Sequence, residues 1–132
     1  MNMQMNMQTP ALPSQNDIHQ LLLLGQAAVE AGPGHFTQDG GPDSPPVPYY
    51  PKPLVNFFIA AGQDPWVDYQ YDIGQCADLL LSANAVEQAD LATLRSLLTF
   101  MVRGERFSDG HWGAMLGQGH LPRWLLRLSE LA

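Results

Sequence analysis

The chain has 132 residues, of which 45% are apolar and 14% charged, with one cysteine and a net charge of −7. This length fits a single domain, and the apolar fraction supports one modest core, which argues against disorder of the whole chain. One cysteine excludes an intramolecular disulfide and any zinc site built from several cysteines.

Charge is distributed unevenly along the chain. Residues 1–90 carry ten acidic side chains against Lys52 alone, a net charge of −9, whereas residues 91–132 carry five arginines against three acids, a net charge of +2. Binding to a nucleic-acid backbone requires clustered lysine and arginine, so the acidic total argues against direct nucleic-acid binding. The acidic half is suited instead to a basic protein surface.

Three features of the sequence favour a cytoplasmic protein. The longest apolar run near the N-terminus, residues 21–24, is far shorter than the roughly 20 residues of a membrane span, so no membrane partner is expected. A secretory signal has a basic segment before its apolar stretch, but the first basic residue here is Lys52. The lone Cys76 fits a reducing compartment, and we expect a buried structural thiol.

The N-terminal part is predicted to contain a tail followed by a helix. Residues 1–16, which begin with Met-Asn-Met-Gln twice, have no turn chemistry and are expected to form a flexible tail before a helical domain of residues 17–132. Ser14 or Asn16 can cap a helix that runs from about residue 17 to residue 31.

A proline-rich connector follows this helix. Residues 33–53 contain seven prolines and three glycines, which predicts an extended strap that Tyr49 and Tyr50 partly pin to the domain. Pro53 suits the first turn of a second helix ending near Ala61, and this helix is apolar on almost every side, which indicates a central place in the core.

The middle of the chain is predicted to form two short helical segments. Asp64-Pro65-Trp66 has the pattern of a cap followed by proline at the first helical position, which predicts a short helix ending near Tyr71. Another turn or two of helix is expected around residues 76–82.

The clearest helix begins after Asp90, because leucine, methionine and valine recur at helical spacing as far as Gly104. Ser108 or Asp109 is expected to cap a short helix that ends at Gly117 or Gly119, and residues 121–131 form the last helix. No alternating run of β-branched residues reaches strand length. The predicted fold is all-α, a small irregular bundle of five to six helices with the strap between the first two.

The C-terminal part resembles a known family. The stretches ADLATLRSLLTFMVR (residues 89–103), RFSDGHW (residues 106–112) and LLRLSEL (residues 125–131) resemble small bacterial and mobile-element proteins known only as a domain of unknown function. Residues 64–66 give a weaker similarity. The resemblance implies a prokaryotic cytoplasmic setting, and it assigns no catalytic residue.

A segment of alternating aspartates and aromatics is the most suggestive candidate site. In a helix, four-residue steps advance about 6 Å, close to the spacing of successive phosphates, so a row of carboxylates could mimic a nucleic-acid backbone and occupy a basic groove. A solvated helix face above buried aromatics is the more common explanation of such a pattern. The candidate partner-binding residues are Asp64, Trp66, Asp68, Tyr69, Asp72 and Asp78.

The arginines are open to two interpretations. Arg95, Arg103 and Arg106 could form a phosphate-binding face, but a solvated face of the helix is favoured. Arg123 and Arg127 are like charges one turn apart, which indicates an acidic partner, and the acidic half of the same chain is the obvious candidate.

Catalytic and metal-binding patterns are weak. Ser108, Asp109 and His111 are too close in sequence to form a nucleophilic triad unaided, and capping is the simpler explanation. The histidines lack the spacing of a helical metal site, and no nucleotide-binding glycine pattern is present, so neither a metal nor a cofactor is expected.

These observations favour a non-enzymatic protein-interaction module that occupies a basic surface, such as that of a nucleic-acid-binding complex. A specific form of this hypothesis is an anti-CRISPR-like inhibitor from a mobile element. Two alternatives stay open: a small enzyme with a site at helix ends near Tyr69, Arg106, Asp109 and His111, and a regulatory subunit that docks through Trp66 and the tyrosines of the strap.

Overall fold

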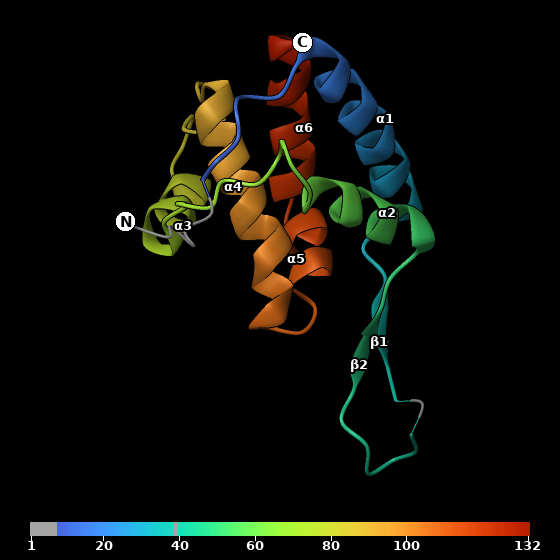
Figure 1. Cartoon of the computed structure of the whole chain (residues 1–132). Coiled ribbons are helices and arrows are strands. Elements are labelled where there is room, and N and C mark those ends of the chain that lie inside the picture. Colours follow the sequence, from blue (N-terminus) through green and yellow to red (C-terminus); the bar gives the residue numbers. More distant parts are fainter. Residues whose placement is uncertain (1–7, 39) are drawn as a thin grey trace, which may run out of the picture.

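The computed structural model describes residues 8–38 and 40–132, and this part of the chain is mostly helical (Figure 1). The prediction of a small all-α bundle is confirmed. None of the described helices combines the length and the apolar character needed to cross a membrane. The elements are α1 (Gln15–Ala31), β1 (His35–Thr37), β2 (Val47–Tyr49), α2 (Lys52–Ala61), α3 (Ile73–Leu81), α4 (Leu91–Arg103), the 3-10 turn η1 (Gly104–Arg106), α5 (His111–Gly117) and α6 (His120–Leu131).

Helix α1 begins with a reciprocal capping box. The hydroxyl of Ser14 accepts the amide N–H of Asp17, and the carboxylate of Asp17 accepts the amide N–H of Ser14. The helix buries Ile18, Leu21 and Ala28 as it packs against α2 and α6. Residues 15 and 16, which the prediction assigned to the tail, are the first residues of this helix. Residues 1–7 of the tail lie outside the described part, and residues 8–14 cross from the side of α3 and α4 to the start of α1 (Figure 1).

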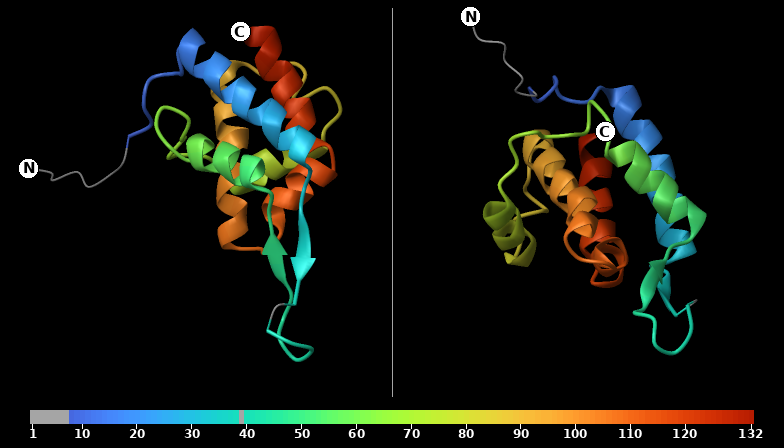
Figure 2. Two further views of the ribbon diagram at one scale, coloured as in Figure 1. Left: turned by 90° about the vertical axis from the view of Figure 1, so that its right-hand side faces the viewer. Right: turned by 60° about the horizontal axis from the view of Figure 1, so that its bottom comes forward.

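The proline-rich strap forms a β-hairpin, which the prediction of a strand-free connector missed. Strands β1 and β2 pair antiparallel, with His35 opposite Tyr49 and Thr37 opposite Val47. Each strand has three residues and a free edge, so Pro48 is tolerated without an amide N–H. Such short strands lack the alternating pattern by which a strand is predicted. The hairpin projects from the helical body beside α1 and α2 (Figures 1 and 2).

The segment between α2 and α3 is not helical, so the predicted helix from Asp64 to Tyr71 is wrong. The Asp64–Pro65 peptide bond is cis, and the chain continues through turns until Asp72 caps α3. Distant side chains satisfy two of its amides: Asp68 donates to Thr99 Oγ1 at 2.9 Å, and Tyr69 donates to Thr9 Oγ1 at 3.0 Å. These tertiary bonds replace the bonds to preceding carbonyls that a helix requires.

Helix α4 forms where its apolar spacing predicts, and it lies at the centre of the core, the place that was expected for the second helix, α2, whose Ile59 is 54% exposed. Asp90 caps it by accepting the amide N–H of Thr93 at 2.8 Å, and Leu94, Leu97 and Met101 are fully buried. It contacts α2, α3, α5 and α6. From α6, the buried indole of Trp124 donates to the carbonyl of Leu94 at 2.8 Å. This helix therefore provides the rigid wall against which any site on the α3 side is built.

The start of α5 differs from the prediction. Neither Ser108 nor Asp109 caps the helix; Gly110, at φ +89°, precedes its first residue. The carboxylate of Glu105 accepts the amide N–H groups of Gly110 (3.1 Å) and Trp112 (2.9 Å), so an acidic side chain from η1 performs the capping. A left-handed conformation suits glycine and disfavours other residues at this position.

Candidate functional site

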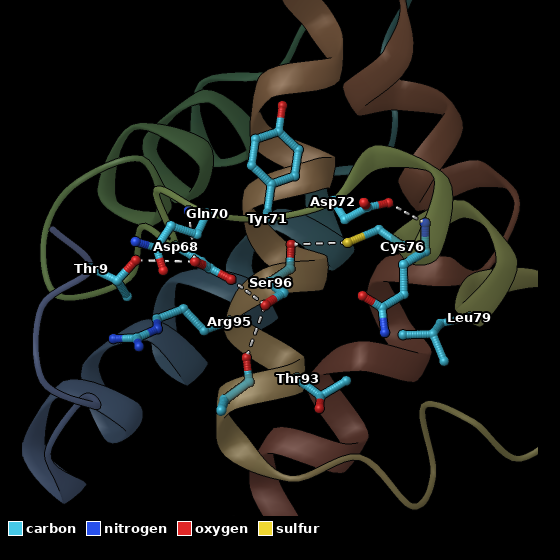
Figure 3. Close-up of a pocket in the computed structure, with 12 residues that line it drawn as sticks. Thr9, Asp68, Gln70, Tyr71, Asp72, Cys76, Leu79, Thr93, Arg95 and Ser96 are labelled. Atoms are coloured by element: carbon cyan, nitrogen blue, oxygen red, sulfur yellow. Dashed lines mark hydrogen bonds between the residues drawn. The ribbon is translucent and has the colours of Figure 1, made fainter. Parts of the chain in front are cut away.

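An open pocket of about 380 Å³ lies between α3, the first half of α4 and the loop of residues 68–72 (Figure 3). It overlaps the aspartate and aromatic segment singled out from the sequence. We refer to its rim and walls as the acidic pocket. Its lining residues are Thr9, Asp68, Gln70, Tyr71, Asp72, Gln75, Cys76, Leu79, Ala92, Thr93, Arg95 and Ser96.

Asp68 is the best-anchored carboxylate of the acidic pocket. Its Oδ1 accepts the amide N–H of Gln70 at 2.9 Å and the hydroxyl of Thr9 at 3.1 Å, and its Oδ2 accepts the hydroxyl of Ser96. Burial alone would raise the pKa of Asp68, but these hydrogen bonds, from Ser96 above all, and the nearby charge of Arg95 together hold it below its ordinary value. Asp68 is therefore ionised at neutral pH and fixed in orientation.

Asp72 and Cys76 form the opposite wall of the pocket. Asp72 Oδ1 accepts the amide N–H of Gln75 at 2.8 Å and thereby caps α3. One turn later the buried thiol of Cys76 donates to the carbonyl of Ser96 at 3.5 Å, which joins α3 to α4. Burial, and then the negative charges of Asp68 and Asp72, raise the pKa of Cys76 to about 11. The expectation of a buried thiol is confirmed.

Arg95 is a buried residue and not part of a solvated face. Its side chain is 7% exposed, and Nη1 donates to the carbonyls of Pro10 (2.8 Å), Ala11 (3.0 Å) and Pro65 (3.2 Å). Its Nε is buried without a hydrogen-bond partner among the described residues. Arg95 therefore binds neighbouring backbone and does not present a cation to solvent.

The other two arginines of this set lie elsewhere. The guanidinium of Arg103 lies over the rings of Tyr69 and Tyr71, with its carbon 5.6 Å and 5.4 Å from the ring centres. Arg106 is exposed on η1. The three arginines thus do not share one surface.

The structure brings two of the six predicted site residues, Asp68 and Asp72, into the acidic pocket. Asp64 is exposed and accepts the hydroxyl of Tyr69 at 3.0 Å. Trp66, 5% exposed, packs edge-on against Trp124 in the core, and Asp78 is exposed on α3. Because the segment is not one helix, its aspartates do not form a row with helical spacing.

Sequence reasoning missed most of the uncharged lining residues and the burial of Arg95. One signal could have identified Arg95: it lies four residues after Leu91 and three before Leu98, and therefore on the apolar stripe of its helix. No sequence signal connects Thr9 with Asp68, which are 59 positions apart. That contact depends on the path of the chain alone.

The residues of the alternative enzymatic site do not line a common pocket. A mainly apolar pocket of about 260 Å³ includes His111 and Ser108, but Tyr69, Arg106 and Asp109 are not among its described lining residues. Burial lowers the pKa of His111, whose ring lies edge-on to Phe100. Within the described residues, no group of three or more histidines, cysteines or acids is placed to hold a metal ion.

The aromatics of the third hypothesis are divided between core and surface. Tyr49 on the hairpin is 58% exposed, whereas Tyr50 packs against Trp112, and Trp66 is buried. A contiguous exposed patch of these three residues does not form.

Comparison with known proteins places the chain in a family. A family model described as "Family of unknown function (DUF6508)" matches residues 34–132. The chain belongs to this family. Comparisons with curated proteins and with solved structures found no match. The DUF6508 range contains every lining residue of the acidic pocket except Thr9, and it leaves out α1 and residues 8–14.

Proposed function

We propose that this DUF6508 chain is a non-enzymatic protein-interaction module that binds a basic partner through the acidic pocket. The observation that carries the proposal is the arrangement of charge there. Asp68 and Asp72 face the pocket, while Arg95, the one basic residue among its described lining residues, is buried and bonded to backbone carbonyls. The accessible charge is therefore negative.

Asp72 is the carboxylate best placed to meet a partner. It is exposed, and its Oδ1 caps α3 while no described residue donates to Oδ2. A lysine or arginine side chain entering the pocket could bind this oxygen and the hydroxyl of Thr93 in the lining. Such charge complementarity contributes to specificity and to the rate of association.

The more specific form of the proposal is an inhibitor of a nucleic-acid-binding complex. A basic groove that normally holds nucleic acid is the surface most complementary to residues 1–90, whose net charge is −9. A CRISPR effector is one such complex, and the chain would then act as an anti-CRISPR inhibitor.

The proposal is tested by affinity purification from a bacterial lysate with quantitative mass spectrometry. The pocket variant is Asp72→Asn, because asparagine retains the cap of α3. Its matched control, Asp43→Asn, removes the same charge from an exposed residue outside the pocket.

We expect the wild-type protein and the control to recover the same basic partner, and the pocket variant to lose it. The captured complex should also dissociate as the salt concentration rises. Equal recovery by the two variants would rule out the acidic pocket as the partner site.

A further inference from the structure

Residues 9–11 lie on the domain in the manner of a bound extended peptide. Arg95 Nη1 donates to the carbonyls of Pro10 and Ala11, at 2.8 Å and 3.0 Å. The hydroxyl of Thr9 accepts the amide N–H of Tyr69 at 3.0 Å and donates to Asp68 Oδ1 at 3.1 Å. Four hydrogen bonds therefore hold three consecutive residues that belong to no helix or strand.

The groups that hold this segment are fixed by the rest of the domain. Arg95 is buried in the wall of α4 and is also bonded to the carbonyl of Pro65, and its buried Nε has no partner among the described residues. Asp68 is oriented by Ser96 and by the amide of Gln70. Because these groups are already ordered, the site loses little conformational entropy when it binds a ligand.

The receptor groups and the segment belong to different parts of the chain. Asp68, Tyr69 and Arg95 lie within the DUF6508 range of residues 34–132, whereas Thr9, Pro10 and Ala11 precede it. The binding groups thus lie within the matched range, and the bound segment lies outside it.

The contacts define the chemistry of a suitable ligand. A guanidinium that binds two successive carbonyls recognises the backbone of an extended segment and accepts different side chains at these positions. The pairing of Tyr69 N–H with the Asp68 carboxylate requires a group that both accepts and donates, which a serine or threonine hydroxyl provides. Pro10 follows this hydroxyl, and a proline both keeps the segment extended and places no amide N–H at this position.

We propose that Asp68, Tyr69 and Arg95 form a binding site for an extended Ser/Thr-Pro segment of a partner protein, and that residues 9–11 occupy this site as a built-in competitor. Residues 9–11 can leave the site and be replaced by a partner segment, because they are bound mainly by polar contacts. Ala11 is exposed and Leu12 is 50% exposed. Pro13 is buried and can keep the chain anchored while residues 9–11 leave. This site shares Asp68 and Arg95 with the acidic pocket, but its ligand is recognised by a hydroxyl and two carbonyls and not by a positive charge.

The test is an NMR titration of the full chain with the hexapeptide Gln-Thr-Pro-Ala-Leu-Pro, which reproduces residues 8–13. The Thr9→Val variant keeps the shape of the side chain but weakens the internal competitor. We expect the peptide to shift the Tyr69 amide and the Arg95 Nε–H signals, with about tenfold higher affinity for Thr9→Val than for the wild type, because the tethered segment competes at high effective concentration.

The matched control peptide is Gln-Val-Pro-Ala-Leu-Pro, and it should bind Thr9→Val about tenfold more weakly, since it lacks the hydroxyl. The absence of saturable shifts in Thr9→Val, equal affinity for the two peptides, or equal affinity of the wild type and Thr9→Val would each overturn the proposal. The Asp72→Asn variant should bind the hexapeptide normally. Loss of its basic partner with retained peptide binding would separate the outcome for this site from that for the acidic pocket.

Discussion

The guanidinium of Arg123 on α6 binds both carboxylate oxygens of Glu87, with Nη2 2.8 Å from Oε1 and Nε donating to Oε2. The same guanidinium donates to the carbonyls of Leu80 and Ser82, at 3.0 Å and 2.9 Å. It therefore ties α6 to the end of α3 and to the turn that follows. The predicted acidic partner of this arginine is confirmed, and it lies in the acidic half of the chain.

This pair predicts a specific dependence of stability on pH. The hydrogen bond from Arg123 lowers the pKa of Glu87 from 4.5 to about 2. A carboxylate with a depressed pKa in the folded state contributes stability above pH 4.5, and this contribution is lost as the pH falls towards 2. Glu87→Gln should lower the melting temperature at neutral pH. When the melting temperature, measured by circular dichroism, is plotted against pH, the curves of the variant and the wild type should converge near pH 2.

Other carboxylates, including Asp68 and Asp90, titrate in both proteins, so the difference between the two curves isolates Glu87. Curves that stay parallel from pH 7 to acid would contradict a stabilising role for the ionised side chain.

Of the acidic residues in the C-terminal half, Glu105 is the one whose replacement we expect to destabilise the fold most. It accepts the hydroxyl of Tyr50 at 2.7 Å as well as the two amides at the start of α5. Glu105→Ala leaves these donors without their partner, and we expect the free energy of unfolding to fall by about 2 kcal/mol in urea titrations. Arg106→Ala, a change at the exposed neighbour, should alter it by less than about 0.5 kcal/mol. Similar losses for the two variants would show that Glu105 does not hold α5 in place.

Two helical glycines are predicted to respond oppositely to alanine. Gly25 is buried in α1, and a Cβ there would overlap the side chain of Leu125 on α6, so Gly25→Ala should cost about 1–3 kcal/mol through overpacking. Gly74, in the first turn of α3, has room for a Cβ, and Gly74→Ala should stabilise by up to about 1 kcal/mol. Denaturant titrations of both variants measure these changes in the free energy of unfolding. Stabilisation by Gly25→Ala would mean that Leu125 moves aside at little cost.

The sequence predicts those parts of the fold that depend on local chemistry. The caps at Ser14 and Asp90 and the apolar stripe of α4 act within a few residues, and the structure has all three. The segment from Asp64 to Tyr71 has an equally clear local signal for a helix, but Thr9 and Thr99 bind its amides from far away in the sequence. Tertiary bonds therefore override local preference there.

The candidate site was predictable only in part for the same reason. Asp68 and Asp72 stand out as acidic residues in a segment without basic residues, and both line the pocket. Their neighbours Ser96 and Thr9 carry no signal of their own, because hydroxyl residues are common at helix surfaces and in extended segments. Only the folded path of the chain reveals that both hydroxyls donate to the carboxylate of Asp68.

Cys76 provides a chemical probe of the negative potential in the acidic pocket. With its pKa raised to about 11, the thiol is ionised in only about one molecule in a thousand at pH 8, and its reaction with a disulfide reagent such as DTNB should be slow. The rate should increase steeply with pH and should match that of an ordinary thiol once the chain is unfolded in guanidinium.

Because the charge of Asp72 is one cause of the raised pKa of Cys76, Asp72→Asn should speed the reaction of the folded protein severalfold while the cap of α3 is kept. Asp43→Asn, which removes a charge from the hairpin loop, should leave the rate unchanged. If both variants react at the wild-type rate, burial and the charge of Asp68 protect the thiol without Asp72. Asp72 would then contribute little to the potential of the pocket, which would weaken the case for a basic partner there.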